Sequence, residues 1–291
     1  METKKGPAIS AVSVLTAAAL WGLVGMWTRV LMAGGLSPMT ITALRNPLCT
    51  VLMCLVFLVK DRSVFHVRRE HVKYFLGTGA VSVTLFSVCL FTCQKLCSLA
   101  VASVLSYTAP SFVVLLSAIL WKEPVTKRKA AALALTLIGA CCVCGLFDRG
   151  LSVTVPGILM GLGAGLSYAL YNIFGHGALE HYGPMTVTVW TFLVAGPTSL
   201  LLLRPSELVP AFGSAPWLLL VLLGLSLFST MLPYFFYTWG LSGMEPGRAS
   251  ILTTSDVVVT VLVGTLLFGE PLTASTVIGI LCVLAGIYIL R

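Results

Sequence analysis

Charged residues are scarce in this chain. Of its 291 residues only 10% are charged, whereas 58% are hydrophobic. A soluble domain carries about 25% charged residues, so the composition excludes an ordinary soluble protein. No lysine is followed by Ser or Thr, which excludes the Walker A motif of a self-contained ATP-driven pump.

Histidine is also scarce, and its positions argue against a catalytic or metal centre. The four histidines fall on one predicted side of a membrane: His66, His71, His176 and His181. Six of the nine cysteines fall toward the other side: Cys89, Cys93, Cys97, Cys141, Cys142 and Cys144. Because no histidine accompanies them, we interpret the cysteines as small apolar side chains. A soft-metal site or an external disulfide is the alternative. We expect no metal, no cofactor and no enzymatic activity.

Ten apolar stretches follow one another, each long enough to cross a hydrocarbon core of about 30 Å. They cover residues 9–32, 38–59, 74–93, 99–121, 129–147, 154–175, 184–203, 215–240, 249–268 and 272–290. Closed β-barrels give strands of about ten alternating residues, so helices are the better interpretation. The predicted fold class is an all-α integral membrane protein with ten transmembrane helices.

The first stretch follows Lys4 and Lys5, which is also how a cleaved signal peptide begins. It runs on to Met32, too far for the apolar region of such a peptide. We therefore expect the first helix to be retained.

Positive charge is concentrated on one predicted side. Eleven of the 18 Lys and Arg residues lie near the N-terminus or after the second or fourth helix: Lys4, Lys5, Lys60, Arg62, Arg68, Arg69, Lys73, Lys122, Lys127, Arg128 and Lys129. The positive-inside rule then places both termini in the cytoplasm and the chain in the cell membrane. The net charge of +8 is therefore a topology signal, and no nucleic-acid partner is expected. Contact of residues 60–73 with anionic lipid is a secondary interpretation.

The chain repeats itself about 147 residues apart. Residues Ala102 to Gly139 align without a gap on Ala249 to Gly286, with eleven of 38 positions identical. A second match, Pro38 to Thr42 on Pro184 to Thr188, occurs at an offset of 146. This spacing is far above solenoid periods and indicates a duplicated half-protein.

The number of helices per repeat predicts how the two copies are oriented. We divide the chain into a first repeat, residues 1–147, and a second repeat, residues 148–291, each with five helices. Five is odd, so equivalent helices run in opposite directions and the repeats are inverted. Each copy has a Glu-Pro-x-Thr turn, at Glu123 and at Glu270, which should end one helix and let the threonine cap the next. A proton-carrying role for these glutamates is the minority alternative.

Two ionisable residues inside the apolar stretches are candidates for the substrate site. Arg45 lies in the second helix and Asp256 in the ninth, at different depths, which leaves a direct pair between them open. A charge at the bilayer centre costs at least about 2.5–3.5 kcal/mol, so each should face a cavity or a partner. Asp256 aligns with Ala109, so only the second repeat carries a buried acid.

Aromatic and polar residues form the second set of candidates. Trp21, Tyr107, Tyr168, Asn172 and Tyr234 are predicted to line a pocket for a small organic solute. Tyr168 and Asn172 are four residues apart and share one helix face. The competing interpretation is structural, because Trp and Tyr also populate membrane interfaces.

These features together resemble the drug/metabolite transporter superfamily, specifically its EamA-type ten-helix members. The resemblance is carried by Trp21-Gly22, Arg45, the segment from Ala102 to Pro110, Glu123-Pro124-Val125-Thr126 and Gly269-Glu270-Pro271-Leu272-Thr273. It implies inverted five-helix repeats, a central cavity and secondary transport, commonly export of amino acids or related metabolites. Where the family often has an acidic residue followed by proline in the ninth helix, Asp256 is followed by Val257.

We therefore expect a secondary transporter that exports a small metabolite by alternating access. Its partners would be the small-molecule substrate and the lipid bilayer, with protons as the candidate coupling ion; the oligomeric state is left open. The alternative is a non-transporting membrane sensor or assembly subunit, which is disfavoured because no soluble domain accompanies the helices.

Overall fold

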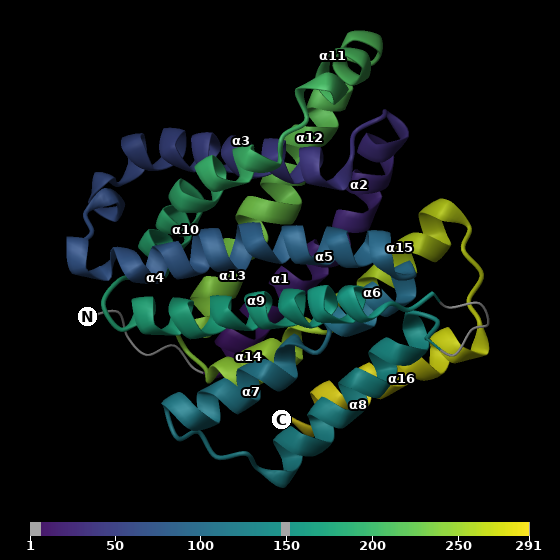
Figure 1. The fold of residues 1–291 in the computed structure, drawn as a ribbon. Helices are drawn as coiled ribbons and strands as arrows, with labels where there is room; N and C mark the ends of the chain where they lie inside the picture. The colour runs from purple at the N-terminus through teal and green to yellow at the C-terminus, as the bar shows by residue number, and fades with distance from the viewer. Residues whose placement is uncertain (1–6, 147–151, 291) are drawn as a thin grey trace.

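The computed structural model describes residues 7–146 and 152–290, and these ranges form helices without strands (Figure 1). The first repeat contains α1 (Pro7–Gly22), α2 (Val24–Ala33), α3 (Pro38–Lys60), η1 (Arg62–Phe65), η2 (Arg69–His71), α4 (Val72–Leu76), the π-helix η3 (Gly77–Thr84), α5 (Leu85–Leu96), α6 (Leu99–Ser106), α7 (Ala109–Leu120) and α8 (Lys127–Val143). The second contains α9 (Val155–Leu179), α10 (Pro184–Ser199), η4 (Leu200–Leu202), α11 (Pro205–Ser214), α12 (Leu218–Ser226), the π-helix η5 (Leu227–Met231), α13 (Leu232–Leu241), α14 (Pro246–Thr253), α15 (Asp256–Phe268) and α16 (Ala274–Ile289). The boundary expected at 147/148 and the lysines at 4 and 5 lie outside the described residues.

Eight helical segments of the described chain are long and apolar enough to cross a membrane. The other two expected spans are α8 and α16, with 17 and 16 residues. They occupy equivalent places in the two repeats and pack against each other (Figure 1). Counting both gives the predicted architecture of ten helices in two inverted five-helix repeats.

The contact between α8 and α16 depends on small residues. A Cβ atom added to Gly139 would lie 2.7 Å from the backbone oxygen of Gly279, and one added to Gly286 would lie 2.9 Å from the backbone oxygen of Ala132. The two backbones therefore touch, which is the usual way for helices to gain packing contacts in lipid. Both helices begin as predicted: the hydroxyls of Thr126 and Thr273 accept hydrogen bonds from the third backbone N–H of α8 and α16.

The fourth and ninth spans are each broken in the middle. The fourth consists of α6 and α7, interrupted at Tyr107-Thr108, and the ninth consists of α14 and α15, interrupted at Thr254-Ser255. The two breaks are 147 residues apart, so α6 is equivalent to α14 and α7 to α15. In discontinuous membrane helices the freed backbone groups lie where a cavity or neighbouring protein can satisfy them.

The third and eighth spans carry the second pair of irregularities. Their π-helices η3 and η5 end at Thr84 and Met231, which are again 147 residues apart. Pro110 stands at the second position of α7, after the break in the fourth span, and Pro233 stands at the second position of α13, after the π-helix η5. Pro47 and Pro197 lie within α3 and α10.

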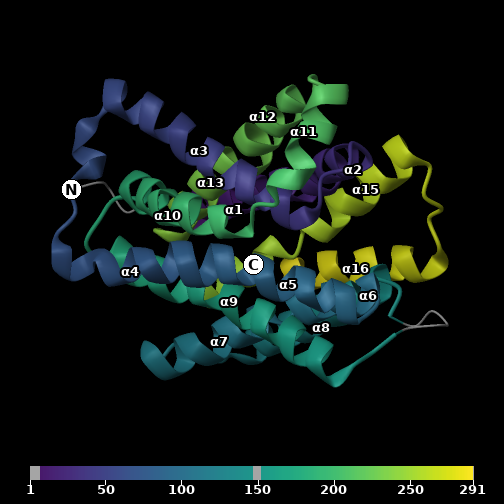
Figure 2. The ribbon, with the colours of Figure 1, turned by 45° about the horizontal axis from the view of Figure 1, so that its top comes forward.

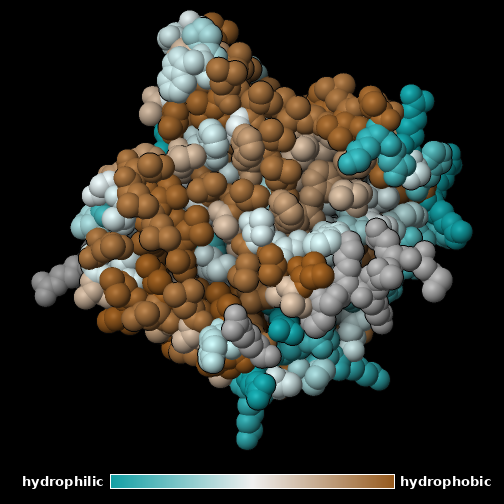
Figure 3. All heavy atoms as spheres, turned by 180° about the vertical axis from the view of Figure 1, so that it is seen from behind, coloured by the Kyte–Doolittle hydropathy of each residue, from teal (hydrophilic) through white to brown (hydrophobic). Residues whose placement is uncertain are grey.

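The connections rich in Lys and Arg meet at one end of the bundle, here called the basic end (residues 60–73 and 121–129). Both contact the last turn of α9 and the residues just after it: the His71 ring stacks on His181 at 4.2 Å, and the Trp121 ring lies 4.8 Å from His176. Figure 3 shows the molecule from behind, so the basic end lies on the right. Hydrophilic side chains gather on that side, while apolar side chains cover most of the rest of this view. The opposite end carries the α5–α6 and α15–α16 connections (Figures 1 and 2).

The broken helices pack differently at the two ends. At the basic end α7 packs against α14, so halves from opposite repeats are closed on each other. At the opposite end the main partner of α6 is α9, and the main partner of α15 is α1. The broken helices of the two repeats therefore pack against each other at the basic end, whereas at the opposite end each packs mainly against another helix.

Candidate functional site

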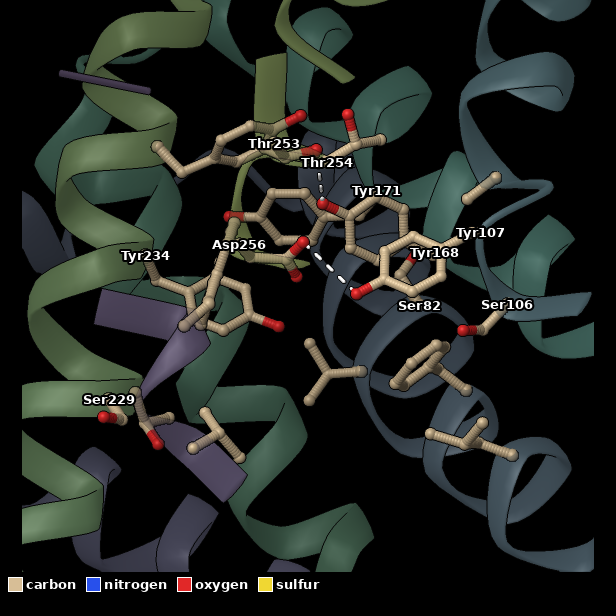
Figure 4. Close-up of a pocket in the computed structure, with 18 of the residues that line it drawn as sticks. Ser82, Ser106, Tyr107, Tyr168, Tyr171, Ser229, Tyr234, Thr253, Thr254 and Asp256 are labelled. Carbon is tan, nitrogen blue, oxygen red and sulfur yellow. Dashed lines mark hydrogen bonds between the residues drawn. The ribbon is translucent and has the colours of Figure 1, made fainter. Parts of the chain in front are cut away.

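A cavity of about 300 Å³ lies where the broken helices of the two repeats meet (Figure 4). Its walls are formed by Trp21, Val24, Arg45, Ser82, Val83, Phe86, Leu90, Gln94, Ser103, Ser106, Tyr107, Ala109, Pro110, Tyr168, Tyr171, Ser229, Thr230, Tyr234, Tyr237, Thr253, Thr254 and Asp256. The lining reaches Gln94 in the last turn of α5, near the opposite end. Within the described chain it includes nothing of α7 beyond Pro110 and nothing of α14 before Thr253. The cavity thus extends toward the opposite end and stops short of the basic end.

The cavity is lined by equivalent positions of the two repeats. Eight pairs of lining residues are 147 positions apart: Trp21/Tyr168, Val24/Tyr171, Ser82/Ser229, Val83/Thr230, Leu90/Tyr237, Ser106/Thr253, Tyr107/Thr254 and Ala109/Asp256. Equivalent helices therefore supply equivalent positions to one site. This is the location expected for the substrate site of a protein built from inverted repeats.

Asp256 provides the negative charge of the cavity. It is the first residue of α15, directly after the break in the ninth span. Its Oδ1 accepts a hydrogen bond of 3.3 Å from the hydroxyl of Tyr107, which stands at the break in the fourth span (Figure 4). Among the described residues no Lys, Arg or His nitrogen lies within 4 Å of this carboxylate. A carboxylate in a membrane span without a basic partner is available to a ligand or a proton.

Arg45 provides the positive charge, from α3. Its Nε is buried without a hydrogen-bond partner in the described structure, and its guanidinium makes no ion pair there. The pair with Asp256 that the sequence left open is therefore not formed. Two opposite charges face the same cavity, and neither neutralises the other.

Aromatic rings form part of the cavity wall. The Trp21 ring lies 5.3 Å from both Tyr234 and Tyr237, and Tyr171 lies 5.3 Å from Tyr234. Hydrogen bonds hold the phenols in place: Tyr171 pairs with Thr238 at 2.9 Å, and Tyr168 donates to Thr253 at 3.3 Å. Rings fixed in this way give a preformed, half-apolar surface.

Six of the seven residues predicted to bind substrate line this cavity, and Asn172 does not. Asn172 is fully buried behind the wall, where its Oδ1 accepts a hydrogen bond from the Tyr237 hydroxyl. Its Nδ2 donates to the backbone oxygen of Tyr168 at 3.4 Å. The prediction that Tyr168 and Asn172 share a helix face is compatible with this arrangement, but Asn172 turns toward α13. Asn172 therefore supports a lining residue and is not one itself.

Several polar lining residues were missed by the sequence analysis. Ser82 and Ser229 come from the two π-helices, and Thr253 and Thr254 come from the break before Asp256. One signal was present: Gly77 followed by Ser82 recurs as Gly224 followed by Ser229 at the same offset of 147. Extending the repeat into the third and eighth spans would have identified both serines.

Comparison with known proteins now places the chain in a family. The sequence model of the EamA-like transporter family matches residues 8–145 and 155–291. The chain belongs to the EamA-like transporter family. This EamA-like transporter is thus a multi-pass membrane protein, and each match covers one of the two halves described above.

Relatives of this EamA-like transporter cover most of its length. It is 29% identical over 254 residues to an uncharacterized transporter of Archaeoglobus fulgidus, which covers 87% of this chain and 88% of that protein. It is 27% identical to the uncharacterized transporter YwfM of Bacillus subtilis, over 95% of this chain and 92% of that protein. A probable amino-acid metabolite efflux pump of Salmonella typhimurium is 26% identical, over 65% of this chain and 66% of that protein. A crystal structure with 18% identity has a TM-score of 0.82 over 96% of this chain and 95% of that one, which shows the shared fold.

Proposed function

We propose that this transporter exports a small zwitterionic or amphiphilic metabolite, with amino acids as the first candidates, by alternating access. The observation that carries the proposal is the pair of opposite charges, Arg45 and Asp256, that face one cavity without pairing. A guanidinium binds a carboxylate through charge-assisted hydrogen bonds, and a carboxylate accepts them from an ammonium. The name of the Salmonella relative points to the same class of substrate.

We also propose that the basic end faces the cytoplasm, with both termini on that side of the cell membrane. The excess of Lys and Arg in residues 60–73 and 121–129 supports this orientation. Labelling of cysteines introduced at exposed Arg69 and exposed Leu272 with an impermeant maleimide, in whole cells of a cysteine-free variant, tests it. Reaction at 272 alone is expected, and reaction at 69 alone would reverse the orientation.

Coupling to protons is a finer proposal for the same site. Because Asp256 has no basic partner among the described residues, its carboxylate can hold either a proton or the substrate's ammonium. Mutually exclusive binding of the two would couple export to proton entry. Substrate flux driven by an imposed pH gradient is expected in the wild type, whereas Asp256→Asn should make any remaining flux independent of that gradient.

The decisive experiment is flux in proteoliposomes. The panel compares amino acids that have aromatic or aliphatic side chains with the matching amines, which lack the carboxylate, and the matching acids, which lack the amine. The zwitterions are expected to be transported best. Saturable flux of the amines and acids at the same rate as the zwitterions would contradict a site that uses both charges. No flux of any compound would favour the non-transporting alternative.

Variants then assign each charge. Arg45→Gln should raise KM for the zwitterions by about 10- to 100-fold, the effect of one lost charge-assisted hydrogen bond, but leave the amines unaffected. Asp256→Asn should raise KM for the zwitterions and the amines but leave KM for the acids, which lack an amine, unchanged. Arg69→Gln, at an exposed arginine of the basic end, is the matched control and should behave like the wild type. Equal loss for all compounds in both variants would indicate a structural role instead.

A further inference from the structure

Lys129 joins the two repeats at the basic end. Its Nζ lies 2.5 Å from Oε2 of Glu245 and 3.4 Å from Oε2 of Glu123. Glu123 and Lys129 belong to the first repeat, and Glu245 belongs to the second, directly before α14. The side chains of Lys129 and Glu123 are only 9% and 12% exposed, so their contact is largely shielded from solvent, whereas the side chain of Glu245 is half exposed.

The contact lies where the basic end is closed. A Cβ atom added to Gly247, in the first turn of α14, would lie 3.3 Å from Val114 of α7 and 3.5 Å from Oε2 of Glu123. The ion contact is therefore continuous with the α7–α14 packing that separates the cavity from this end. Opening the basic end requires α7 and α14 to part, and that movement would separate Lys129 from Glu245.

Among the described residues, the opposite end has no ion contact at the positions equivalent to Lys129 and Glu245. The position equivalent to Lys129 is Thr276, and the position equivalent to Glu245 is Ser98. Thr276 pairs with the hydroxyl of Thr273 at 2.9 Å, and Ser98 caps α6. The equivalent of Glu123 is Glu270, which pairs instead with Arg29 of α2. This ion pair also joins the two repeats, but both side chains are about half exposed and neither belongs to α6. If α6 and α15 closed as α7 and α14 do, the positions equivalent to Lys129 and Glu245 would supply neither an ammonium nor a carboxylate between them.

We propose that Lys129, Glu123 and Glu245 form a one-sided ionic lock that keeps the basic end closed and makes the cavity rest open toward the opposite end. The inference rests on the proposed alternating-access function, because it assigns an energy difference to the two states of that cycle. Removing the ammonium leaves the poorly hydrated Glu123 carboxylate without its partner and close to a second carboxylate, that of Glu245, whereas the two can separate and Glu123 can be hydrated once the end opens. Loss of the lysine must therefore shift the population toward the state that is open at the basic end.

The test measures the conformation directly, in the full chain reconstituted in lipid. Genetically encoded labels at Val125 and Ser242 report the distance across the basic end. Labels at the equivalent positions, Leu272 and Lys95, report the distance across the opposite end. All four positions are exposed. We expect the wild type to show mainly a short distance for the first pair and a long distance for the second.

Lys129→Met should increase the population with a long distance between 125 and 242 by about tenfold or more, because the two carboxylates are left unpaired. Lys129→Arg retains the charge and should match the wild type, as should Arg128→Met, which changes the exposed neighbour on the same helix. Glu245→Gln changes a half-exposed side chain that folding tolerates, and should shift the same population in the same direction. Unchanged distances in Glu245→Gln and Lys129→Met would overturn the lock.

A gain-of-function variant tests the proposal from the other end. Ser98→Glu combined with Thr276→Lys places the equivalents of Glu245 and Lys129 at the opposite end, beside Glu270. The distance between 272 and 95 is then expected to shorten in a larger fraction of molecules, and no change would count against the lock. The proposed function is tested separately by flux. If the variants change the distances but no compound is transported, the lock is supported and the transport proposal is wrong. If compounds are transported but the distances do not change in the variants, the transport proposal is supported and the lock is wrong.

Discussion

Tyr107 and Asp256 come from the breaks in equivalent helices of opposite repeats, and a single hydrogen bond of 3.3 Å joins them across the cavity. The phenol is the one hydrogen-bonding side chain that the described structure gives this carboxylate. The bond therefore orients Asp256 toward the cavity and connects the two repeats at the level of the site.

Tyr107→Phe removes this bond and keeps the ring. Loss of one hydrogen bond of this length should cost about 1 kcal/mol, or about a fivefold rise in KM for substrates that carry an amine. KM and maximal flux in proteoliposomes provide the measurement. Ser106→Ala, which removes the neighbouring lining hydroxyl, is the control and should change KM less. An unchanged KM in Tyr107→Phe would show that Asp256 is oriented without the phenol.

Asn172→Ala should destabilise the protein and disturb the cavity wall together. The change leaves the Tyr237 hydroxyl buried without its acceptor, at a cost of about 1–3 kcal/mol. Thermal unfolding in detergent should show a lower Tm, and flux should show a higher KM. Asn172→Ala combined with Tyr237→Phe removes both partners, so the double variant should be more stable than the sum of the two single changes predicts. Strict additivity would mean that the hydrogen bond does not position the ring.

Gly139→Ala should weaken the contact between α8 and α16. The added Cβ would lie 2.7 Å from a backbone oxygen, which cannot move as a flexible side chain can, so a loss of about 1–3 kcal/mol is expected. Gly25→Ala is the matched control, because no atom lies within 4 Å of its added Cβ and alanine is the better helix former. Thermal unfolding should separate the two, with a lower Tm for Gly139→Ala and an unchanged or higher Tm for Gly25→Ala.

Glu207 of α11 should contribute stability that depends on pH. Burial alone would raise the pKa of its carboxyl group, but hydrogen bonds from the backbone and hydroxyl of Ser37 and from Thr40 lower that pKa overall. A lowered pKa means that the stabilisation is complete above the ordinary value of 4.5 and is lost as the pH falls through the lower value. Glu207→Gln should therefore lower Tm by about 2 °C at pH 7, the equivalent of about 1 kcal/mol, and by much less at pH 3. Glu180→Gln, at an exposed glutamate, is the control; a Tm difference that is the same at both pH values would contradict this role.

The membrane fold and the region of the candidate site could be predicted, because both depend on patterns that can be read directly along the sequence. Long apolar stretches identify the spans, and the offset of 147 identifies the repeats whose meeting point holds the cavity. The orientation of Asn172 could not be predicted, because a spacing of four residues defines a helix face but not the neighbour it meets. Ser82 and Ser229 were equally hidden, because a serine in an apolar helix is common and only the π-helical turn brings it to the cavity.

The glycine contact between α8 and α16 also bears on which parts of the bundle have to move. Exchanging the two repeats converts the Gly139–Gly279 approach into the Gly286–Ala132 approach, and both already exist in the same structure. Because exchanging the repeats leaves the α8–α16 contact unchanged, this contact does not have to break when the two repeats exchange their conformations. The same exchange converts the packing of α7 on α14 into packing of α15 on α6. In the proposed alternating-access cycle, the α8–α16 contact would therefore persist in both states, whereas the α7–α14 contact and the equivalent α6–α15 contact would form in turn.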